Sequence, residues 1–201
     1  FALMSSKANP RRVHIVADMD WINDERVYLR LQELGFVPWS SANLKYLFSK
    51  NQIVAVFPEG ASAVRKPFTE RYRLCEFDWT RILPAVEENI TIFPLATVGL
   101  DEAIPTITNV DGIAKILGLP GYPVSPFMPL LPFPANLLAS LPVEWRMKLI
   151  KPTAYEAEES RDDIEETAKH QSRLIEGEIQ AEINRILRLR NKSQGSTNSQ
   201  F

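Results

Sequence analysis

The sequence has little of several things that common protein functions require. Among its 201 residues there is one cysteine, Cys75, and there are only two histidines. A single cysteine excludes an intrachain disulfide bond and a cysteine-based metal site, and we expect no bound metal. The sequence also has no glycine-rich phosphate loop, no zinc-ligand spacing and no Gly-x-Ser-x-Gly motif, so nucleotide hydrolysis, zinc chemistry and serine hydrolysis lack support.

An excess of basic residues is absent as well. Lys and Arg together number 23, Asp and Glu 25, and the formal net charge is −2. A protein that binds a polyanion needs a clear basic excess or a dense basic stripe, so nucleic acid is not expected as a partner. Hydrophobic residues make up 45% and charged residues 24% of the chain, which is typical of a folded globular protein.

Charged residues are missing altogether between Ile116 and Val143. The stretch is long enough for a transmembrane helix, but its prolines exclude one, because each removes a helical donor and clashes with the preceding turn. Six of its prolines lie close together, at Pro120, Pro123, Pro126, Pro129, Pro132 and Pro134. We expect an extended, polyproline-like segment whose apolar side chains either pack against the protein or enter a lipid interface.

Short apolar runs alternate with helical patterns over the rest of the chain. Strands are predicted at residues 12–17, 36–37, 53–57, 91–99 and 145–150, and helices at 24–34, around 44–48, at 77–86 and at 161–189. This alternation indicates an α/β fold with a mixed, largely parallel sheet flanked by helices. We expect one domain over residues 1–152, a C-terminal helix within 153–192 that packs on it, and a disordered tail over 193–201.

The clearest predicted strand, from Ile53 to Phe57, runs directly into Pro58-Glu59-Gly60. A continuous apolar run of this kind is typical of a parallel strand buried on both faces, and ligands bind at the carboxyl ends of such strands. Glu59 is therefore predicted to hydrogen-bond a substrate hydroxyl or to hold a neighbouring loop. Gly60 is predicted to let the backbone approach a ligand closely or to adopt a positive φ. The alternatives are that Glu59 caps local backbone amides and that Gly60 is an ordinary turn glycine.

Three blocks of the chain resemble the lysophospholipid and glycerol-phosphate acyltransferases, and they follow in the order that this family shows. They are Gly35-Phe36-Val37, Phe57-Pro58-Glu59-Gly60 and Ile92-Phe93-Pro94-Leu95. Residues 66–74 and 117–120 are similar to a bacterial-type branch of the family. The resemblance covers roughly residues 10–152.

The resemblance implies a glycerolipid acyltransferase-like domain. Such an enzyme is an O-acyltransferase, which moves a fatty acyl group from acyl-CoA or acyl-carrier protein to a hydroxyl of a lysophospholipid or glycerol phosphate. Such an enzyme needs no cofactor beyond this acyl thioester. The resemblance also implies a cytoplasmic protein that is peripheral on a membrane surface. The alternative is a non-catalytic lipid-binding or scaffold module with the same fold.

The catalytic residues that this family would supply are missing from the sequence. Its members carry a His-x4-Asp block, in which the histidine is the general base and the aspartate orients it. His14 is followed by Asp18 and Asp20 at spacings of four and six rather than five, and His170 lies in the C-terminal helix. Because the sequence begins at Phe1 without a start methionine, we expect a longer protein that carries the block upstream. A homologue without catalytic power is the alternative, and the chain alone is expected to be inactive.

Basic residues that follow the Pro58-Glu59-Gly60 turn form a second predicted binding group. They are Arg65, Lys66, Arg71 and Arg73. The resemblance implies that they grip a phosphate head group, the arginines bidentately and the lysine as a point charge, with Arg71 and Arg73 favoured. In the alternative they form a solvated loop that pairs with Glu70 and Glu76.

Three more polar or aromatic residues, Asp18, Asp20 and Trp21, follow the first predicted strand. A parallel sheet places ligand contacts at such a position. A helix-entry cap explains the two acids equally well from sequence and is the interpretation that we favour for both.

Overall fold

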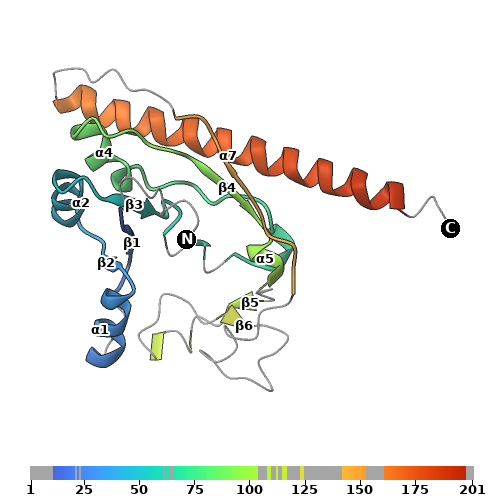
Figure 1. The fold of residues 1–201 in the computed structure, drawn as a ribbon, viewed down its shortest axis with the longest axis horizontal. Helices are drawn as coiled ribbons and strands as arrows, with labels where there is room; N and C mark the ends of the chain where they lie inside the picture. The colour runs from blue at the N-terminus through green and yellow to red at the C-terminus, as the bar shows by residue number, and fades with distance from the viewer. Residues whose placement is uncertain are drawn as a thin grey trace. The chain divides into compact units, whose positions relative to one another are not determined.

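The computed structural model describes residues 11–20, 22, 24–60, 62–63, 66–103, 108–109, 112, 115–116, 123–124, 142–152 and 161–197 (Figure 1). Within the last segment, side chains are described for residues 163–192. Two compact units are built from alternating segments of the chain. Unit 1 comprises Phe1–Gly60, Phe77–Ile92 and Ala154–Ser172, and unit 2 comprises Ala61–Glu76, Phe93–Thr153 and Arg173–Phe201.

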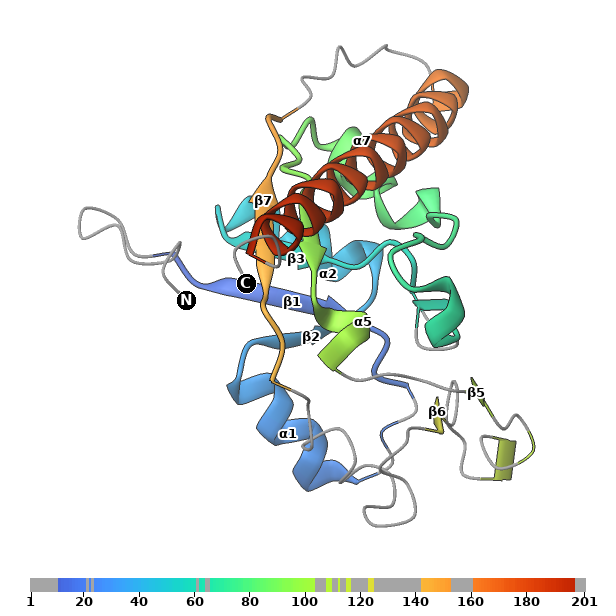
Figure 2. The same cartoon turned by 90° about the vertical axis from the view of Figure 1, so that its right-hand side faces the viewer.

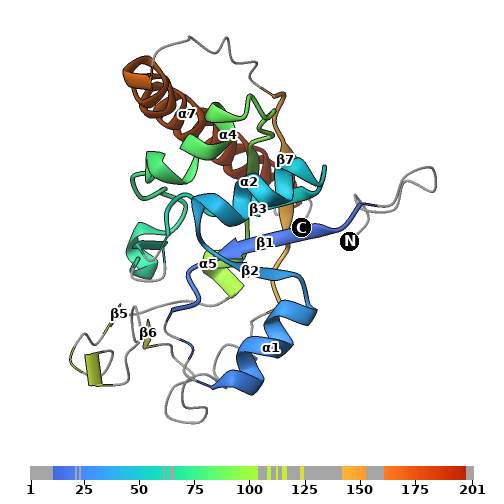
Figure 3. The same cartoon turned by 90° about the vertical axis from the view of Figure 1, so that its left-hand side faces the viewer.

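Unit 1 contains a three-stranded parallel sheet in the order β2-β1-β3. Its strands are β1 (Val13–Ala17), β2 (Phe36–Pro38) and β3 (Ile53–Val56), and Figure 3 shows β1 between the other two. The parallel arrangement confirms the prediction. Burial of β3 on both faces was wrong, because β3 pairs with β1 alone among the described strands and Ile53 is 37% exposed.

Helix α1 (Glu25–Glu33) and helix α2 (Ser41–Ser49) follow the strands of this sheet. Asp24 precedes α1 and caps it. Its carboxylate accepts hydrogen bonds from the backbone N–H groups of Arg26 and Val27. Ser40 caps α2 in the same way through the N–H of Asn43 at 3.0 Å. Each cap satisfies donors that the first helical turn leaves without a partner. Leu44 and Leu47 of α2 are buried with Val16 of β1, which makes the core of this sheet face.

The helix predicted at residues 77–86 is interrupted. A short 3-10 helix, η3 (Trp79–Arg81), precedes helix α4 (Leu83–Glu87). Asp78 caps η3 by accepting from the backbone N–H of Thr80 at 3.0 Å. Pro84 lies in the first turn of α4, where its missing N–H costs least, whereas the middle of one continuous helix would lose a hydrogen bond there.

Unit 2 contains an antiparallel pair of strands, β4 (Leu95–Val98) and β7 (Arg146–Leu149). Helix α5 (Leu100–Ala103) follows β4 directly, and the 3-10 helix η2 (Phe68–Glu70) lies earlier in the unit. A second antiparallel pair joins β5 (Thr108–Asn109) to β6 (Pro123–Val124). Most of the proline-rich segment predicted to be extended lies outside the described residues.

Helix α7 (Arg161–Thr197) is the C-terminal helix. In unit 2, its Ile183 and Ile186 are buried against Ala96 and Val98 of β4, and Figure 2 shows this helix across the β4–β7 pair. The helix continues past residue 189 into the segment predicted as a tail, of which residues 198–201 lie outside the description. The chain is therefore an α/β protein with a small parallel sheet flanked by helices and a C-terminal helix. None of the described helices is long and apolar enough to cross a membrane.

Candidate functional site

The parallel sheet of unit 1 has a topological switch point. From β1 the chain goes to β2 on one side, and from β2 it crosses back to β3 on the other side, so β1 and β3 are neighbours although they are not consecutive in the chain. Ligands of open α/β sheets bind outside the carboxyl ends of the strands at such a point. Here those ends carry Asp18 after β1, Trp39 after β2, and Pro58-Glu59-Gly60 after β3.

Arg81 from η3 is the residue that connects these strand ends. Its Nη2 donates to both carboxylate oxygens of Asp18, at 2.9 and 2.8 Å, and its Cζ lies 5.0 Å from the centre of the Trp39 ring. The Arg81 side chain is only 11% exposed, so its charge depends on these partners. Its Nε is buried and lies 3.5 Å from an Asp78 oxygen, a distance that gives electrostatic attraction without a hydrogen bond.

The turn after β3 packs against this arginine. Gly60 has a φ of +55°, and a Cβ placed on it would lie 3.1 Å from Nη2 of Arg81. The Gly60 N–H donates to the carbonyl of Phe57 at 3.1 Å, and the N–H of Asp78 donates to the carbonyl of Pro58 at 2.9 Å. Gly60 is therefore required both for its backbone conformation and for the close approach of Arg81. Glu59, which is half-buried, stands inside this fixed turn.

The interpretation of Asp18 as a helix cap was wrong, because Asp24 caps α1 and Asp18 binds Arg81. Asp20 is exposed, and Trp21 lies outside the described residues. A dyad of His14 with Asp18 is excluded, since His14 is the second residue of β1 and four residues of extended chain span roughly 13 Å.

Lys66, in unit 2, is committed to neighbouring groups. Its Nζ donates to the carboxylate of Asp101 at 3.1 Å and to the backbone carbonyl of Arg73 at 3.0 Å, and its side chain is 11% exposed. Glu70 and Glu76 were the partners considered from sequence, and the structure gives Asp101 instead. Lys66 thus connects the loop around η2 to helix α5.

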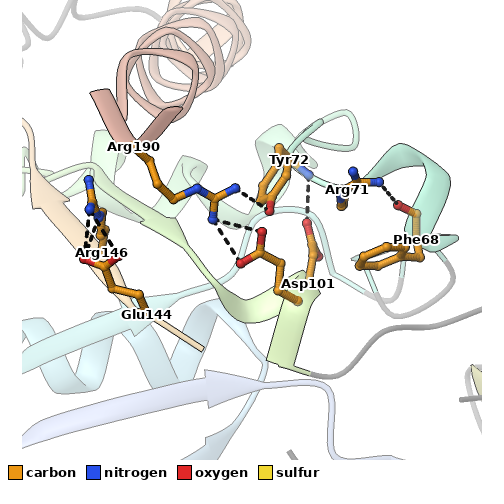
Figure 4. A network of polar contacts seen from close by, with 8 residues as sticks. Phe68, Arg71, Tyr72, Asp101, Glu144, Arg146 and Arg190 are labelled. Atoms are coloured by element: carbon orange, nitrogen blue, oxygen red, sulfur yellow. Dashed lines mark hydrogen bonds and ion pairs between the residues drawn. The ribbon is translucent and has the colours of Figure 1, made fainter. Parts of the chain in front are cut away.

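Arg71 is placed differently from Lys66, since its side chain is exposed. Its guanidinium carbon lies 4.6 Å from the Phe68 ring centre and 5.7 Å from that of Tyr72, and its Nη1 is 3.4 Å from the Phe68 carbonyl (Figure 4). Stacking on aromatic faces leaves the edge of a guanidinium open to an anion. Arg73, two residues further, is exposed as well.

Tyr72, between the two arginines, has a φ of +68°, which costs a bulky residue about 1–3 kcal/mol. Its N–H donates to Asp101 at 2.8 Å and its hydroxyl accepts from Arg190 at 3.0 Å (Figure 4). Its carbonyl accepts from Gln180 at 2.8 Å. Arg190 also pairs with Glu102 at 2.9 Å and is only 15% exposed. Asp101 and Glu102 belong to α5, and Gln180 and Arg190 to α7, so both helices hold this residue.

The predicted binding residues thus fall into two groups. Pro58, Glu59 and Gly60 belong to unit 1, while Lys66, Arg71 and Arg73 belong to unit 2; Arg65 lies outside the described residues. Sequence reasoning missed Arg81 and Tyr72. No local pattern could have identified their partners, since Arg81 and Asp18 are 63 residues apart and Tyr72 and Arg190 are 118 apart. Across the part of the chain that is described, no group of three or more His, Cys, Asp or Glu residues could hold a metal ion.

Comparisons with known proteins find sequence relatives and one distant structure. No family model matches the chain. An uncharacterized protein of Mycobacterium leprae is 37% identical over 138 residues, which are 67% of this chain and 37% of that protein. Uncharacterized proteins of Mycobacterium bovis and Mycobacterium tuberculosis are 35% identical over 120 residues, 58% of this chain and 33% of each relative.

The chain therefore spans about a third of the length of these curated relatives. Among solved structures, the crystal structure of the 1-acyl-sn-glycerophosphate acyltransferase PlsC from Thermotoga maritima is similar with a TM-score of 0.44 and 15% identity, covering 82% of this chain and 56% of that chain. A likeness at this level is too weak to show a shared fold or a shared reaction.

Proposed function

We propose that the protein to which this chain belongs transfers a fatty acyl group from an acyl thioester to a hydroxyl of a glycerolipid. The observation that carries the proposal is the Phe57-Pro58-Glu59-Gly60 turn at the switch point of the parallel sheet, packed against Arg81, whose guanidinium pairs with Asp18. The tetrapeptide resembles the family, and its position is one at which a parallel sheet binds ligands. Backbone hydrogen bonds hold this turn on both sides of Glu59.

In the proposed reaction the acceptor hydroxyl oxygen bonds to the acyl carbon, and the carbon–sulfur bond of the thioester breaks. The hydroxyl proton passes to a general base and then to the departing thiolate. Glu59 accepts a hydrogen bond from the acceptor and orients it, while Pro58 and Gly60 shape the turn around it. The base would be the histidine of a His-x4-Asp block outside these 201 residues, and acyl-CoA or acyl-carrier protein would be the donor.

Phosphate binding is a separate part of the proposal, and we assign it to Arg71 and Arg73 of unit 2. Both side chains are exposed, and the stacked guanidinium of Arg71 has an open edge that suits a phosphate. Lys66 supports them indirectly, because its ammonium is already bound to Asp101 and to the Arg73 carbonyl.

Acyl transfer by the complete gene product tests this function. We expect transfer from labelled acyl-CoA to lysophosphatidic acid or glycerol 3-phosphate. Glu59→Gln should lower kcat/KM by about tenfold to a hundredfold, because a neutral amide oxygen accepts a weaker hydrogen bond from the acceptor than the carboxylate does. Glu33→Gln is the matched control, since Glu33 is an exposed glutamate of α1 paired with Arg30. A complete protein that binds these lipids but transfers nothing would instead be the non-catalytic module.

Contact with a membrane surface is part of the same proposal, and we assign it to the proline-rich segment. Changing both Phe127 and Phe133 to Ser should lower flotation with phosphatidylglycerol vesicles several-fold, because two aromatic rings no longer enter the lipid interface. Tyr46→Ser is the control, since Tyr46 is a 62% exposed aromatic of α2. Flotation that stays the same in the double variant would remove this segment from the membrane contact.

A further inference from the structure

The loop that carries the two exposed arginines contains a type II β-turn with an unusual residue in it. Arg71 has φ −51° and ψ 146°, Tyr72 has φ +68°, and the Arg73 N–H donates to the Glu70 carbonyl at 3.1 Å. These features place Arg71 and Tyr72 at the two central positions of the turn. The second of these positions normally requires glycine, because an L side chain there is strained.

The tyrosine side chain supplies contacts that a glycine could not. Its hydroxyl accepts from Nη2 of Arg190 at 3.0 Å, and its ring lies 5.5 Å from the Arg190 guanidinium carbon and 5.7 Å from that of Arg71. The Tyr72 ring therefore lies beside both the exposed arginine of the turn and a largely buried arginine of helix α7 (Figure 4).

The backbone of the same residue is fixed from both sides. Asp101 of α5 accepts from its N–H, and Gln180 of α7 donates to its carbonyl. Gln180 also accepts from the N–H of Leu74 at 2.8 Å, so one α7 side chain spans the loop on both sides of Arg73. With its backbone held at Tyr72 and Leu74, the loop fixes the origins of the Arg71 and Arg73 side chains.

We infer that Tyr72 is a positioning residue, which holds Arg71 and Arg73 as a clamp for the phosphate of the acceptor, and that α7 fixes it through Gln180 and Arg190. The identity of the acceptor rests on the proposed function. Two guanidinium groups with fixed starting points lose less conformational freedom when they bind a phosphate than two groups on a mobile loop. Acceptor affinity is thus set in part by the C-terminal helix.

Kinetics of the complete protein with Tyr72→Gly and Tyr72→Phe separate positioning from folding. Glycine relieves the strain of the turn but removes a ring that packs against the core of unit 2, so the two effects on the free energy of unfolding oppose each other. KM for lysophosphatidic acid should rise about tenfold, while kcat and KM for acyl-CoA stay the same. Tyr72→Phe keeps the ring and loses the bond to Arg190, and we expect a rise of roughly threefold. Arg188→Ala, on the exposed part of α7, should change neither constant.

Other kinetic results would contradict either the positioning role of Tyr72 or the proposed function, and the two cases can be told apart. If Arg71→Ala raises KM for lysophosphatidic acid and Tyr72→Gly does not, the clamp stands and positioning by Tyr72 is overturned. Equal losses toward both substrates together with a lower melting temperature would make Tyr72 merely structural. If the wild type transfers no acyl group, the proposed function fails, and calorimetric titration with glycerol 3-phosphate then tests the inference by itself. Weaker binding by Tyr72→Gly than by the wild type supports the inference. Equal binding by the two proteins, or binding by neither, overturns it.

Discussion

Replacing Asp18 with alanine should lower the free energy of unfolding by about 2–3 kcal/mol, because it leaves the Arg81 guanidinium buried without its carboxylate. Arg81 is 11% exposed and donates to both Asp18 oxygens. Breaking a fully buried ion pair costs about 3–5 kcal/mol of stability. We expect a smaller loss here, because the Asp18 side chain is 36% exposed. Urea denaturation followed by circular dichroism measures the difference.

Asp78→Ala is the matched control for this variant. Asp78 is 47% exposed and lies 3.5 Å from Nε of the same arginine, and it also caps η3 through the N–H of Thr80. Its loss should cost about 1 kcal/mol, mostly from the cap, which is less than the loss for Asp18→Ala. Combining Asp18→Ala with Arg81→Leu should restore part of the stability, since no buried charge is then left alone. Equal losses for the two aspartate variants would show that Arg81 does not depend on Asp18.

Several elements could be predicted because their determinants are local. The apolar run of β1, the Asp24 cap of α1 and the Ser40 cap of α2 each lie within a few residues of the structure that they determine. The turn after β3 was predicted for the same reason, since strand and turn are adjacent in the sequence. Helical periodicity likewise predicted α7, although its end at Thr197 was not foreseen.

Features that depend on distant segments could not be predicted. The apolar run of β3 suggested burial on both faces, but exposure is decided by which strands lie beside it, and among the described strands only β1 does. Asp18 had the residue type and position of a cap, and only the fold brings Arg81 to it from 63 residues away. The partners of a side chain are set by the topology of the whole fold, and a local sequence pattern carries no information about that topology.

The basic residues of the loop illustrate the same limit. Sequence treats Lys66, Arg71 and Arg73 as one cationic group. The fold separates them, because Asp101 neutralises a mostly buried Lys66 while the two arginine side chains are exposed. A buried, paired cation has already exchanged its water for protein partners, so binding a phosphate would require breaking that pair. Burial therefore separates a residue that holds the loop from two exposed arginines, to which we assign phosphate binding as a proposal.

Gly99→Ala should lower the free energy of unfolding by about 2–4 kcal/mol, because the glycine combines a positive φ with a close backbone contact. Its φ is +119°, and a Cβ there would lie 2.9 Å from the carbonyl oxygen of Glu144 and 3.3 Å from the Cα of Trp145. Both atoms belong to the backbone that leads into β7, so no side-chain rotation relieves the contact. Gly99 lies between β4 and α5, and the strain would also reach Asp101.

Gly177→Ala provides the opposite control within the same unit. Gly177 lies inside helix α7, a Cβ there would meet nothing within 4 Å, and alanine should stabilise the helix by about 0.5–1 kcal/mol. Urea denaturation of the two variants should therefore shift the midpoint in opposite directions. A Gly99→Ala protein as stable as wild type would mean that the β4–β7 pairing can move apart, and the positions of Asp101 and Tyr72 would then not be fixed by it.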